Sequence, residues 1–399
     1  MGSPREEVLN PTMRDVAIVG AGPAGLITAR NLAAAGHDVV VLEEHGTIGI
    51  PVHCTGLLGS DAFDELDLPR HAILAMAQAA RFISSDGNSV IVDAERVRAS
   101  IVDRGVFDQM LADRARAAGA EIHTSARVRS ISLAADRVVI AGDPGESAVQ
   151  ARACVLACGA SYRFNRELGL GVPRTFVQSA QLEAPFAGPE QIEVHFGRDT
   201  APGGFAWVVP FARGGQPFNR VGMLCENGAA ARFATFTKRV RERHAAGEGE
   251  WPEARLKILP LAPIPKTFTA RVVAVGDAAG LVKPTTGGGI YYGLVSGALA
   301  AEVLDGALRH DQFTESRLMQ YERAWRARLG AEIRTGLAFR SIMCRLNDRA
   351  IDSLVELARI DGIVPLLKQT ADFNWHRRSA LTLLRHAPFR RIILGSLWN

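Results

Sequence analysis

The chain has 399 residues, 47% of them hydrophobic and 22% charged, and is long enough to bury a large core in more than one domain. Its net charge of +4 is small and its basic residues are scattered, which argues against nucleic acid as a partner. Five cysteines without regular spacing exclude a zinc or iron–sulfur motif, and no uninterrupted apolar stretch reaches the ~18 residues that a membrane span needs.

The first predicted element is an apolar strand that begins at Val16 and runs into a glycine-rich turn. Gly20 permits the tight turn, Gly22 lets the backbone approach a pyrophosphate, and Gly25 lets the following helix pack close to the strand. The amide dipoles at the start of that helix face the phosphates. We therefore predict a dinucleotide-binding turn that comprises Gly20, Gly22, Pro23, Ala24 and Gly25.

A second strand over residues 38–42 ends in two acidic residues, Glu43 and Glu44. Their distance from the last glycine suits a carboxylate that binds a ribose hydroxyl. Residues 104–118 follow with helical spacing, and the predicted apolar side of this helix carries Val106, Met110, Leu111 and Ala115. Strand-like runs come next at residues 128–133, 138–141 and 151–157.

Residues 172–258 have a different pattern, in which apolar residues alternate with polar ones between Pro and Gly, as in 204–210. This pattern favours a mostly antiparallel sheet that carries the substrate. Alternation puts Phe205 and Trp207 on one face of their strand. Together with Phe211 they provide aromatic surface for a substrate cavity or for the domain core.

A second cofactor motif is predicted at residues 271–289, where a buried strand ends in Asp277 and a loop leads to three glycines that open an Ala-rich helix. A flavin needs such a motif, because the acceptor Asp277 suits its ribityl chain and bare backbone can approach its isoalloxazine ring. The helix N-terminus also stabilises negative charge on the reduced ring. We therefore predict FAD rather than NAD as the cofactor. The predicted residues are Gly276, Asp277, Pro284, Gly287, Gly288, Gly289 and Ile290.

Because the two motifs lie far apart in the sequence, the FAD-binding domain is predicted to be discontinuous. The expected fold class is α/β (α+β): a Rossmann-like FAD-binding domain, an interleaved and mainly antiparallel substrate-binding sheet, and a helical C-terminal extension. The expected boundaries are 14–171 and 259–310 for the FAD-binding domain, 172–258 for the sheet domain, 311–399 for the C-terminal region, and 60–95 as a candidate addition to the sheet domain.

From about residue 14 to about residue 346 the chain resembles the geranylgeranyl reductase family, flavoproteins of the p-hydroxybenzoate hydroxylase-like fold that saturate prenyl double bonds. Besides the flavin motifs, the resemblance rests on PVHCTGLLGS at 51–60, EVHFGRDTAPGGFAWVVP at 193–210 and YERAWRARLG from Tyr321. The resemblance implies that Arg104 lies near the cofactor and that Cys54 lies beside the flavin.

The implied reaction adds a hydride from flavin N5 to one alkene carbon and a proton to the other. Cys54 is the first candidate to deliver or relay this proton and Tyr292 the second, but Cys54 also fits a structural thiol. His53 either tunes the thiol or is a loop histidine, and Tyr291 either closes the substrate cavity or packs its helix. Cys158 stands where the superfamily commonly has an aspartate at the flavin site, and it also fits a small buried residue.

The resemblance further implies a prenyl-lipid substrate and an electron donor, either NAD(P)H or ferredoxin, because the chain has no second dinucleotide motif. Residues 375–398 mix Arg and His with Leu, Phe, Ile and Trp, a pattern typical of an interfacial helix pair on anionic lipid. Alternatively, these apolar residues pack on the protein or on a second subunit. We expect a cytoplasmic protein with peripheral contact to the inner face of the membrane. The sequence leaves its oligomeric state and its particular prenyl substrate open.

Three other functions fit parts of the pattern. An aromatic-ring monooxygenase shares the expected fold and would consume oxygen together with its substrate. A flavin-dependent halogenase has a Trp-x-Trp-x-Ile-Pro segment similar to residues 205–210, but it needs a lysine before that segment, and the first lysine here is Lys238. A non-catalytic flavin-containing lipid carrier would bind prenyl lipid without turnover.

Overall fold

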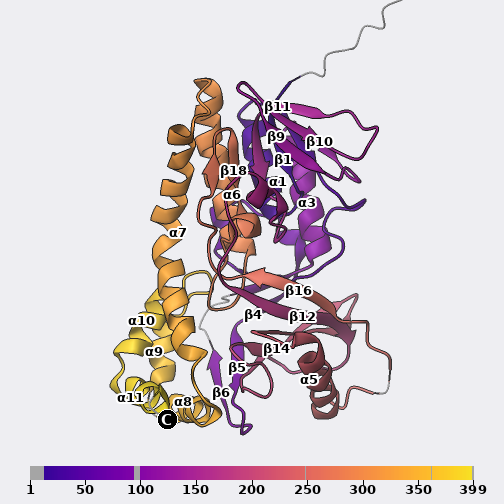
Figure 1. Ribbon diagram of the computed structural model, residues 1–399. Coiled ribbons are helices and arrows are strands. Elements are labelled where there is room, and N and C mark those ends of the chain that lie inside the picture. Colours follow the sequence, from indigo (N-terminus) through magenta and orange to yellow (C-terminus); the bar gives the residue numbers. More distant parts are fainter. Residues whose placement is uncertain (1–12, 94–98, 248, 361, 398–399) are drawn as a thin grey trace, which may run out of the picture.

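The structure is a computed structural model that describes residues 13–93, 99–247, 249–360 and 362–397. Its upper layer in Figure 1 is an eight-stranded sheet with the order β17-β18-β11-β1-β2-β8, from which β10 and β9 continue beside β11. The strands are β1 (Arg14–Val19), β2 (Val39–Leu42), β8 (Glu121–His123), β9 (Ser130–Leu133), β10 (Val138–Ala141), β11 (Val149–Leu156), β17 (Phe268–Thr269) and β18 (Val272–Ala274).

The centre of this first sheet is parallel, since β1 pairs with β2 and β11, and β11 pairs with β18. Parallel strands buried on both faces read as continuous apolar runs, which explains the Val-rich and Ile-rich sequences of β1 and β2. The carboxyl ends of these strands meet at one edge of the sheet. The glycine turn after β1 therefore lies beside the Gly-Asp motif after β18, although about 250 residues separate them in the chain.

Three helices pack on this sheet or on one another: α1 (Pro23–Ala34), α3 (Arg104–Ala117) and α6 (Ile290–Arg309). The contact of α1 with α6 is so close that a Cβ on Gly297 would collide with the carbonyl oxygen of Ala24. Helix α3 is rotated from the predicted orientation. Val106 is 46% exposed, whereas Phe107 is fully buried, because α3 turns the face with Phe107, Leu111 and Ala115 toward the core.

The second sheet, in the lower part of Figure 1, has seven strands in the order β16-β12-β15-β14-β13-β5-β6. All its pairs are antiparallel except β13 with β5. Helix α5 (Ala229–Arg243) covers one face of the sheet through β12 and β15. The strands are β5 (Ala79–Ile83), β6 (Ser89–Asp93), β12 (Phe176–Pro185), β13 (Ile192–His195), β14 (Phe205–Arg213), β15 (Gln216–Cys225) and β16 (Arg255–Pro260).

Short elements connect the two layers. A three-stranded sheet has the order β3-β7-β4, with β3 (Leu57–Gly59), β7 (Ala99–Val102) and β4 (Ile73–Ala77). The short helices are α2 (Ala62–Glu65), α4 (Arg163–Glu167), η1 (Arg70–Ala72) and η2 (Gly276–Ala279). The observed mixture of a Rossmann-like sheet, an antiparallel sheet and C-terminal helices confirms the predicted fold class.

Five helices end the chain, as the sequence predicted for the region beyond residue 311. The 29-residue helix α7 (Glu315–Met343) runs along the upper layer and down to the remaining four (Figure 1). These four are α8 (Asp348–Ile360), α9 (Ile363–Thr370), α10 (Arg377–Arg385) and α11 (Ala387–Leu397). Helices α8 and α9 contact β6, the edge strand of the second sheet. The C-terminal helices therefore close one side of the space between the layers.

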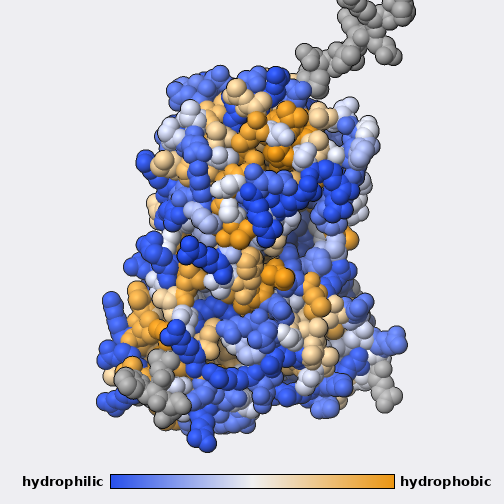
Figure 2. All heavy atoms as spheres, in the orientation of Figure 1, coloured by the Kyte–Doolittle hydropathy of each residue, from blue (hydrophilic) through white to orange (hydrophobic). Residues whose placement is uncertain are grey.

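The tail forms the two helices α10 and α11, and its apolar residues pack on the protein, one of the two arrangements that the sequence left open. Phe389 and Ile393 are each 5% exposed and pack in a cluster with Leu346 and Ala350. On the displayed surface, apolar residues lie over the upper layer, at the waist between the two layers and over the C-terminal helices at the lower left, with hydrophilic residues around them (Figure 2). Within the described residues no helix has the length and apolarity to cross a membrane. Trp398, the last residue of the predicted pair, lies outside the described residues.

Candidate active site

The glycine turn after β1 leaves the N-terminus of α1 open. Gly20 has a φ of +105°, which favours glycine, and a Cβ there would lie 2.5 Å from the carbonyl oxygen of Ala157. Gly25 is packed so closely that a Cβ would collide with the carbonyl oxygen of Gly20. A Cβ on Gly22, by contrast, would meet nothing within 4 Å. Because no side chain caps α1, its free amides suit a pyrophosphate beside Gly22.

The two acidic residues after β2 have different surroundings. Glu43 is buried, and its carboxylate accepts hydrogen bonds from the amide of Ala21 at 2.8 Å and from the amide and ring of His45 at 2.9 and 2.6 Å. Glu44 is exposed and pairs with Arg127 at 3.3 Å. Glu43 is therefore the acidic residue that lies against the glycine turn, and Glu44 lies away from it.

The second cofactor motif is held from behind by hydrogen bonds to its backbone. The Tyr162 hydroxyl donates to the carbonyl oxygen of Asp277 at 2.7 Å, and the Asn165 amide donates to the carbonyl oxygen of Ala278 at 2.9 Å. In the described part of the chain, no group donates a hydrogen bond to the Asp277 carboxylate. This carboxylate lines a cavity, where it is free to accept hydrogen bonds from hydroxyls of a ligand.

The loop between η2 and α6 presents glycine backbone to the same cavity. It is closed by hydrogen bonds from the Lys283 amide to Gly288 at 3.0 Å and from the Gly287 amide to Lys283 at 2.8 Å. Gly287, Gly288, Gly289 and Ile290 line the cavity, whereas Pro284 does not. Pro284 instead packs close to Gly336 of α7.

One cavity of about 870 Å³ joins the predicted cofactor motifs to the second sheet. Its cofactor end is lined by Gly22, Pro23, Ala24, Gly276, Asp277 and the three loop glycines. Its other end is lined by apolar side chains of β5, β6, β14 and the C-terminal helices. The volume and the two-part lining suit a cofactor and an apolar ligand that meet inside the protein.

Cys54 and Arg104 lie together on the wall of this cavity. Arg104 is bound to Asp108 at 2.7 and 3.2 Å, and it lies beside Cys54. Burial lowers the pKa of Arg104, but the charge of Asp108 and the contact with Cys54 outweigh burial and raise it, so Arg104 stays charged. The Cys54 sulfur accepts a hydrogen bond from the Gly56 amide at 3.4 Å. The structure thus brings together the two residues that the family resemblance singled out.

His53 lines the cavity beside Cys54. Its pKa is lowered by burial and by the charges of Lys257, Arg255 and His45, so the imidazole is neutral near pH 7. Cys158 is different, because its neighbours Ala157 and Gly159 line the cavity and Cys158 itself does not. Burial raises the pKa of the Cys158 thiol to about 11, which identifies it as a packed, protonated thiol.

Two of the three predicted aromatic residues of β14 line the cavity. Phe205 and Trp207 lie there with their ring centroids 5.7 Å apart. The indole nitrogen of Trp207 is buried and has no hydrogen-bond partner among the described residues, so a ligand or water is left to accept its proton. Phe211 takes the second role that the sequence left open for it and packs in the domain core, since its ring lies under Arg220, 4.8 Å from the guanidinium, and does not line the cavity.

Neither tyrosine of α6 lines the cavity. Tyr291 donates a hydrogen bond to Glu65 at 2.6 Å and packs edge-on against Trp375. Tyr292 is 2% exposed, and burial raises the pKa of its hydroxyl above the usual value. Both side chains therefore support helix packing, which the sequence left open for them beside closure of the substrate cavity.

Sequence reasoning missed the contribution of the C-terminal region. Side chains of α8, α9, α10 and α11 line the apolar end of the cavity: Ile351, Leu354, Val355, Ala358, Ile363, Leu367, Leu383 and Phe389. Their helical spacing was visible in the sequence, but it fits a membrane face, a subunit interface and a cavity wall equally well. Phe373, which was not predicted as a site residue, also lines the cavity, together with Lys283.

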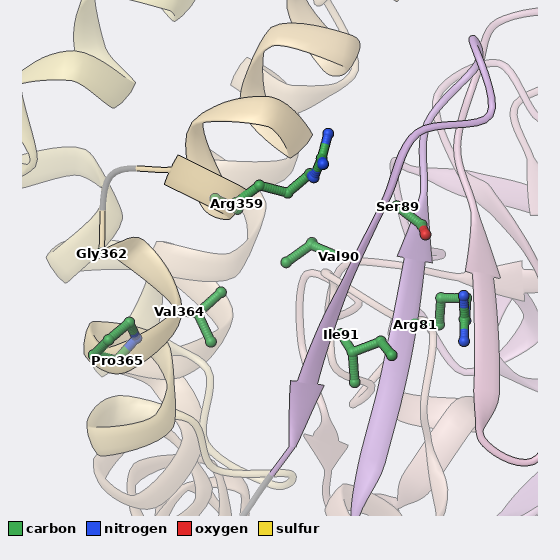
Figure 3. A pocket seen from close by; sticks show the side chains of 9 residues that line it. Arg81, Ser89, Val90, Ile91, Arg359, Gly362, Val364 and Pro365 are labelled. Atoms are coloured by element: carbon green, nitrogen blue, oxygen red, sulfur yellow. The ribbon is translucent and has the colours of Figure 1, made fainter.

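A second hollow of about 600 Å³ lies beside the cavity, between the edge strand β6 and the corner of α8 and α9 (Figure 3). Arg81 on β5 and Arg359 on α8 give it positive charge, and Val364 and Pro365 form part of its wall. Val90 and Ala358 border both hollows. Among the described residues, no group of His, Cys, Asp or Glu side chains could hold a metal ion.

Known proteins resemble this chain at the levels of sequence and of structure. A family model described as pyridine nucleotide-disulphide oxidoreductase matches residues 14–174. Digeranylgeranylglycerophospholipid reductase 1 of Methanopyrus kandleri is 31% identical over 373 residues, which cover 88% of this chain and 98% of the relative.

Two solved structures show the same fold. A geranylgeranyl bacteriochlorophyll reductase-like protein from Thermoplasma acidophilum superposes with a TM-score of 0.84 at 23% identity, covering 96% of this chain and 99% of the other. The halogenase PltM in complex with FAD superposes with a TM-score of 0.68 at 16% identity, covering 97% and 91%. The three proteins therefore share one fold.

Proposed function

This chain belongs to the geranylgeranyl reductase family, and we propose that it binds FAD and saturates carbon–carbon double bonds in the prenyl chain of a lipid. The observation that carries the proposal is the single cavity that joins both glycine motifs to an apolar compartment. An apolar chain that enters from the second sheet meets the cofactor end without leaving the protein. Burial of each CH₂ group of that chain contributes about 0.8 kcal/mol to binding.

The residues present fit FAD. The open N-terminus of α1 at Gly22 would hold the pyrophosphate, Glu43 would bind the ribose, and the free carboxylate of Asp277 would accept hydrogen bonds from the ribityl hydroxyls. Gly287 to Gly289 would allow the isoalloxazine ring to approach the backbone. When bound and reduced, FAD supplies the hydride for the reaction.

The protein has to supply the proton and the positioning. We propose that Cys54 delivers or relays the proton, since it lies on the cavity wall beside Arg104 and next to the cofactor end. Phe205 and Trp207 would hold the prenyl chain against the cofactor. An unactivated alkene is a poor hydride acceptor, so this positioning has to provide a large part of the rate.

The test is to reduce the bound flavin chemically without air, add prenyl lipids, and analyse the products by mass spectrometry. The proposal expects reoxidised flavin and products heavier by pairs of hydrogens. Bound lipid without turnover would refute it in favour of a lipid carrier. Turnover only with oxygen and an aromatic substrate would refute it in favour of a monooxygenase.

We also propose that NAD(P)H or a ferredoxin reduces the flavin and that the protein contacts the membrane peripherally. Such a contact would be electrostatic, because protein largely covers the apolar side chains of the tail. Exposed arginines remain on α10 and α11, namely Arg377, Arg378, Arg385, Arg390 and Arg391. Such residues each attract an anionic lipid surface by roughly 1 kcal/mol.

A further inference from the structure

Lys283 is a buried cation on the wall of the cavity. The residue is 4% exposed, and its ammonium donates a hydrogen bond to the carbonyl oxygen of Phe373 at 2.7 Å. The same nitrogen lies 4.2 Å from the centroid of the Phe373 ring. An ammonium has three N–H donors, and the described residues provide this one acceptor. The remaining donors therefore need acceptors from a ligand or from water.

The segment 371–376, which we name the C-terminal strap, fixes the position of this ammonium. The Phe373 carbonyl also accepts a hydrogen bond from Nε2 of His376 at 3.0 Å, while Nδ1 of His376 lies 2.5 Å from the Thr285 hydroxyl. Burial and the charge of Lys283 lower the pKa of His376 to about 3, so its ring is neutral. Because a carbonyl can only accept, Nε2 carries the proton and Thr285 donates to Nδ1.

No carboxylate neutralises Lys283 by direct contact within the described residues. The charged groups that face it are Asp61 and Asp372, and both already accept hydrogen bonds from Asn374. Their charges raise the pKa of Lys283, but burial has the larger effect and lowers it to about 7. Because the ammonium is buried and has no carboxylate in direct contact, an anionic ligand would stabilise its charged form.

The position of Lys283 indicates which ligand that is. A Cβ on Gly288 would lie 2.9 Å from Cε and 3.6 Å from Nζ of Lys283, so the ammonium borders the glycine backbone of the cofactor loop. The N-terminus of α6 begins one residue after Gly289 and adds positive potential at the same place. A prenyl chain has no atom that accepts a hydrogen bond, whereas an isoalloxazine ring has carbonyl oxygens and carries negative charge when reduced.

We propose that Lys283, positioned by the C-terminal strap, is the cation that stabilises the reduced and negatively charged state of the flavin. This inference rests on the proposed binding of FAD. Lys283 contributes through its charge and its free N–H donors. The strap contributes by fixing the ammonium at the cofactor loop through the ring and the carbonyl of Phe373.

The test is the midpoint potential of bound FAD in wild type and in Lys283→Met, measured at pH 6 by titration with dithionite beside a reference dye. A hydrogen bond to a charged group is typically worth about tenfold or more in an equilibrium constant. We therefore expect the equilibrium constant for reduction of bound FAD to be at least about tenfold lower in Lys283→Met than in wild type. This change makes the two-electron midpoint potential about 30 mV more negative. Lys266→Met is the control, since Lys266 pairs with Glu315 at the surface and should leave the potential unchanged.

A pair of further variants keeps the test decisive if Lys283→Met does not retain FAD. Lys283→Arg keeps the charge and should preserve the wild-type potential, whereas Lys283→Gln keeps a donor without charge and should show the shift. Equal midpoint potentials for Lys283→Arg and Lys283→Gln would overturn the proposal. So would a Lys283→Met protein that retains FAD and whose equilibrium constant for flavin reduction differs less than twofold from wild type. Wild-type protein that binds no FAD would instead refute the proposed function.

Discussion

Replacing Gly22 by Ala should weaken FAD binding without changing the stability of the folded apoprotein. The added Cβ meets no atom within 4 Å, and Gly22 has an extended backbone with a φ of −78°, so an alanine fits without strain. The free energy of unfolding of the apoprotein should therefore stay within about 0.5 kcal/mol of wild type. The new methyl group does, however, occupy the open space beside the free amides of α1, where the pyrophosphate is proposed to bind.

The expected loss of FAD affinity follows from the hydrogen bonds that the methyl group displaces. Loss of a hydrogen bond to a charged phosphate costs about 1.5–3 kcal/mol, so FAD should bind roughly 10- to 100-fold more weakly. Titration of apoprotein with FAD gives the affinity, and urea unfolding gives the stability. Gly25→Ala is the matched contrast, because its Cβ would collide with the backbone of Gly20 and should destabilise the fold by about 1–3 kcal/mol. Wild-type affinity in Gly22→Ala would refute the placement of the pyrophosphate.

Three further perturbations test the rest of the site. Cys54→Ala should still bind FAD and accept electrons, yet slow flavin reoxidation by substrate about 10²–10⁴-fold in anaerobic rapid mixing, and a native rate would make the thiol structural. Trp207→Ala should impair the use of long prenyl substrates more than it impairs FAD binding, and an unchanged substrate profile would assign Trp207 to the core. For the apoprotein, the stability of wild type relative to Lys283→Met should rise with pH between about 7 and 10.5, since in this window Lys283 is protonated when unfolded and neutral when folded; urea unfolding of both proteins measures this difference, and a constant difference would contradict it.

Membrane contact gives a fifth prediction. Because five exposed arginines lie on α10 and α11, the protein should sediment with anionic vesicles at low salt and be released as salt screens the attraction. Charge reversal at Arg390 and Arg391 should weaken sedimentation without affecting FAD binding. Equal sedimentation with neutral vesicles would contradict an electrostatic contact.

The cofactor half of the site could be predicted because its chemistry lies in short, contiguous motifs. The residues from Gly20 to Gly25 form a turn whose geometry is local, and Gly276 with Asp277 ends a strand in the same way. Cys54 and Arg104 could be assigned only through the family resemblance, since 50 residues separate them and no spacing rule connects them.

The sequence could not decide the roles of Tyr292, Phe211 and the tail, because these roles depend on side-chain directions that tertiary packing sets. Tyr292 follows the cofactor loop directly, but α6 turns it toward Trp375 of the strap. Phe211 continues the alternation of Phe205 and Trp207, yet Arg220 on β15 covers it. The tail shows an amphipathic pattern. Such a pattern indicates that one face of a helix is covered, but it does not identify whether protein, a second subunit or lipid covers it.

The contact of Lys283 with the strap also determines when the site can be completed during synthesis of the chain. Lys283 and Phe373 are 90 residues apart, so a ribosome working at about 5–20 residues per second completes the cofactor loop roughly 5–18 s before the strap. During that interval the nascent chain carries both glycine motifs but not the wall that later covers Lys283. Loading of the cofactor can therefore begin before the strap has been made, and docking of the strap is the event that covers Lys283.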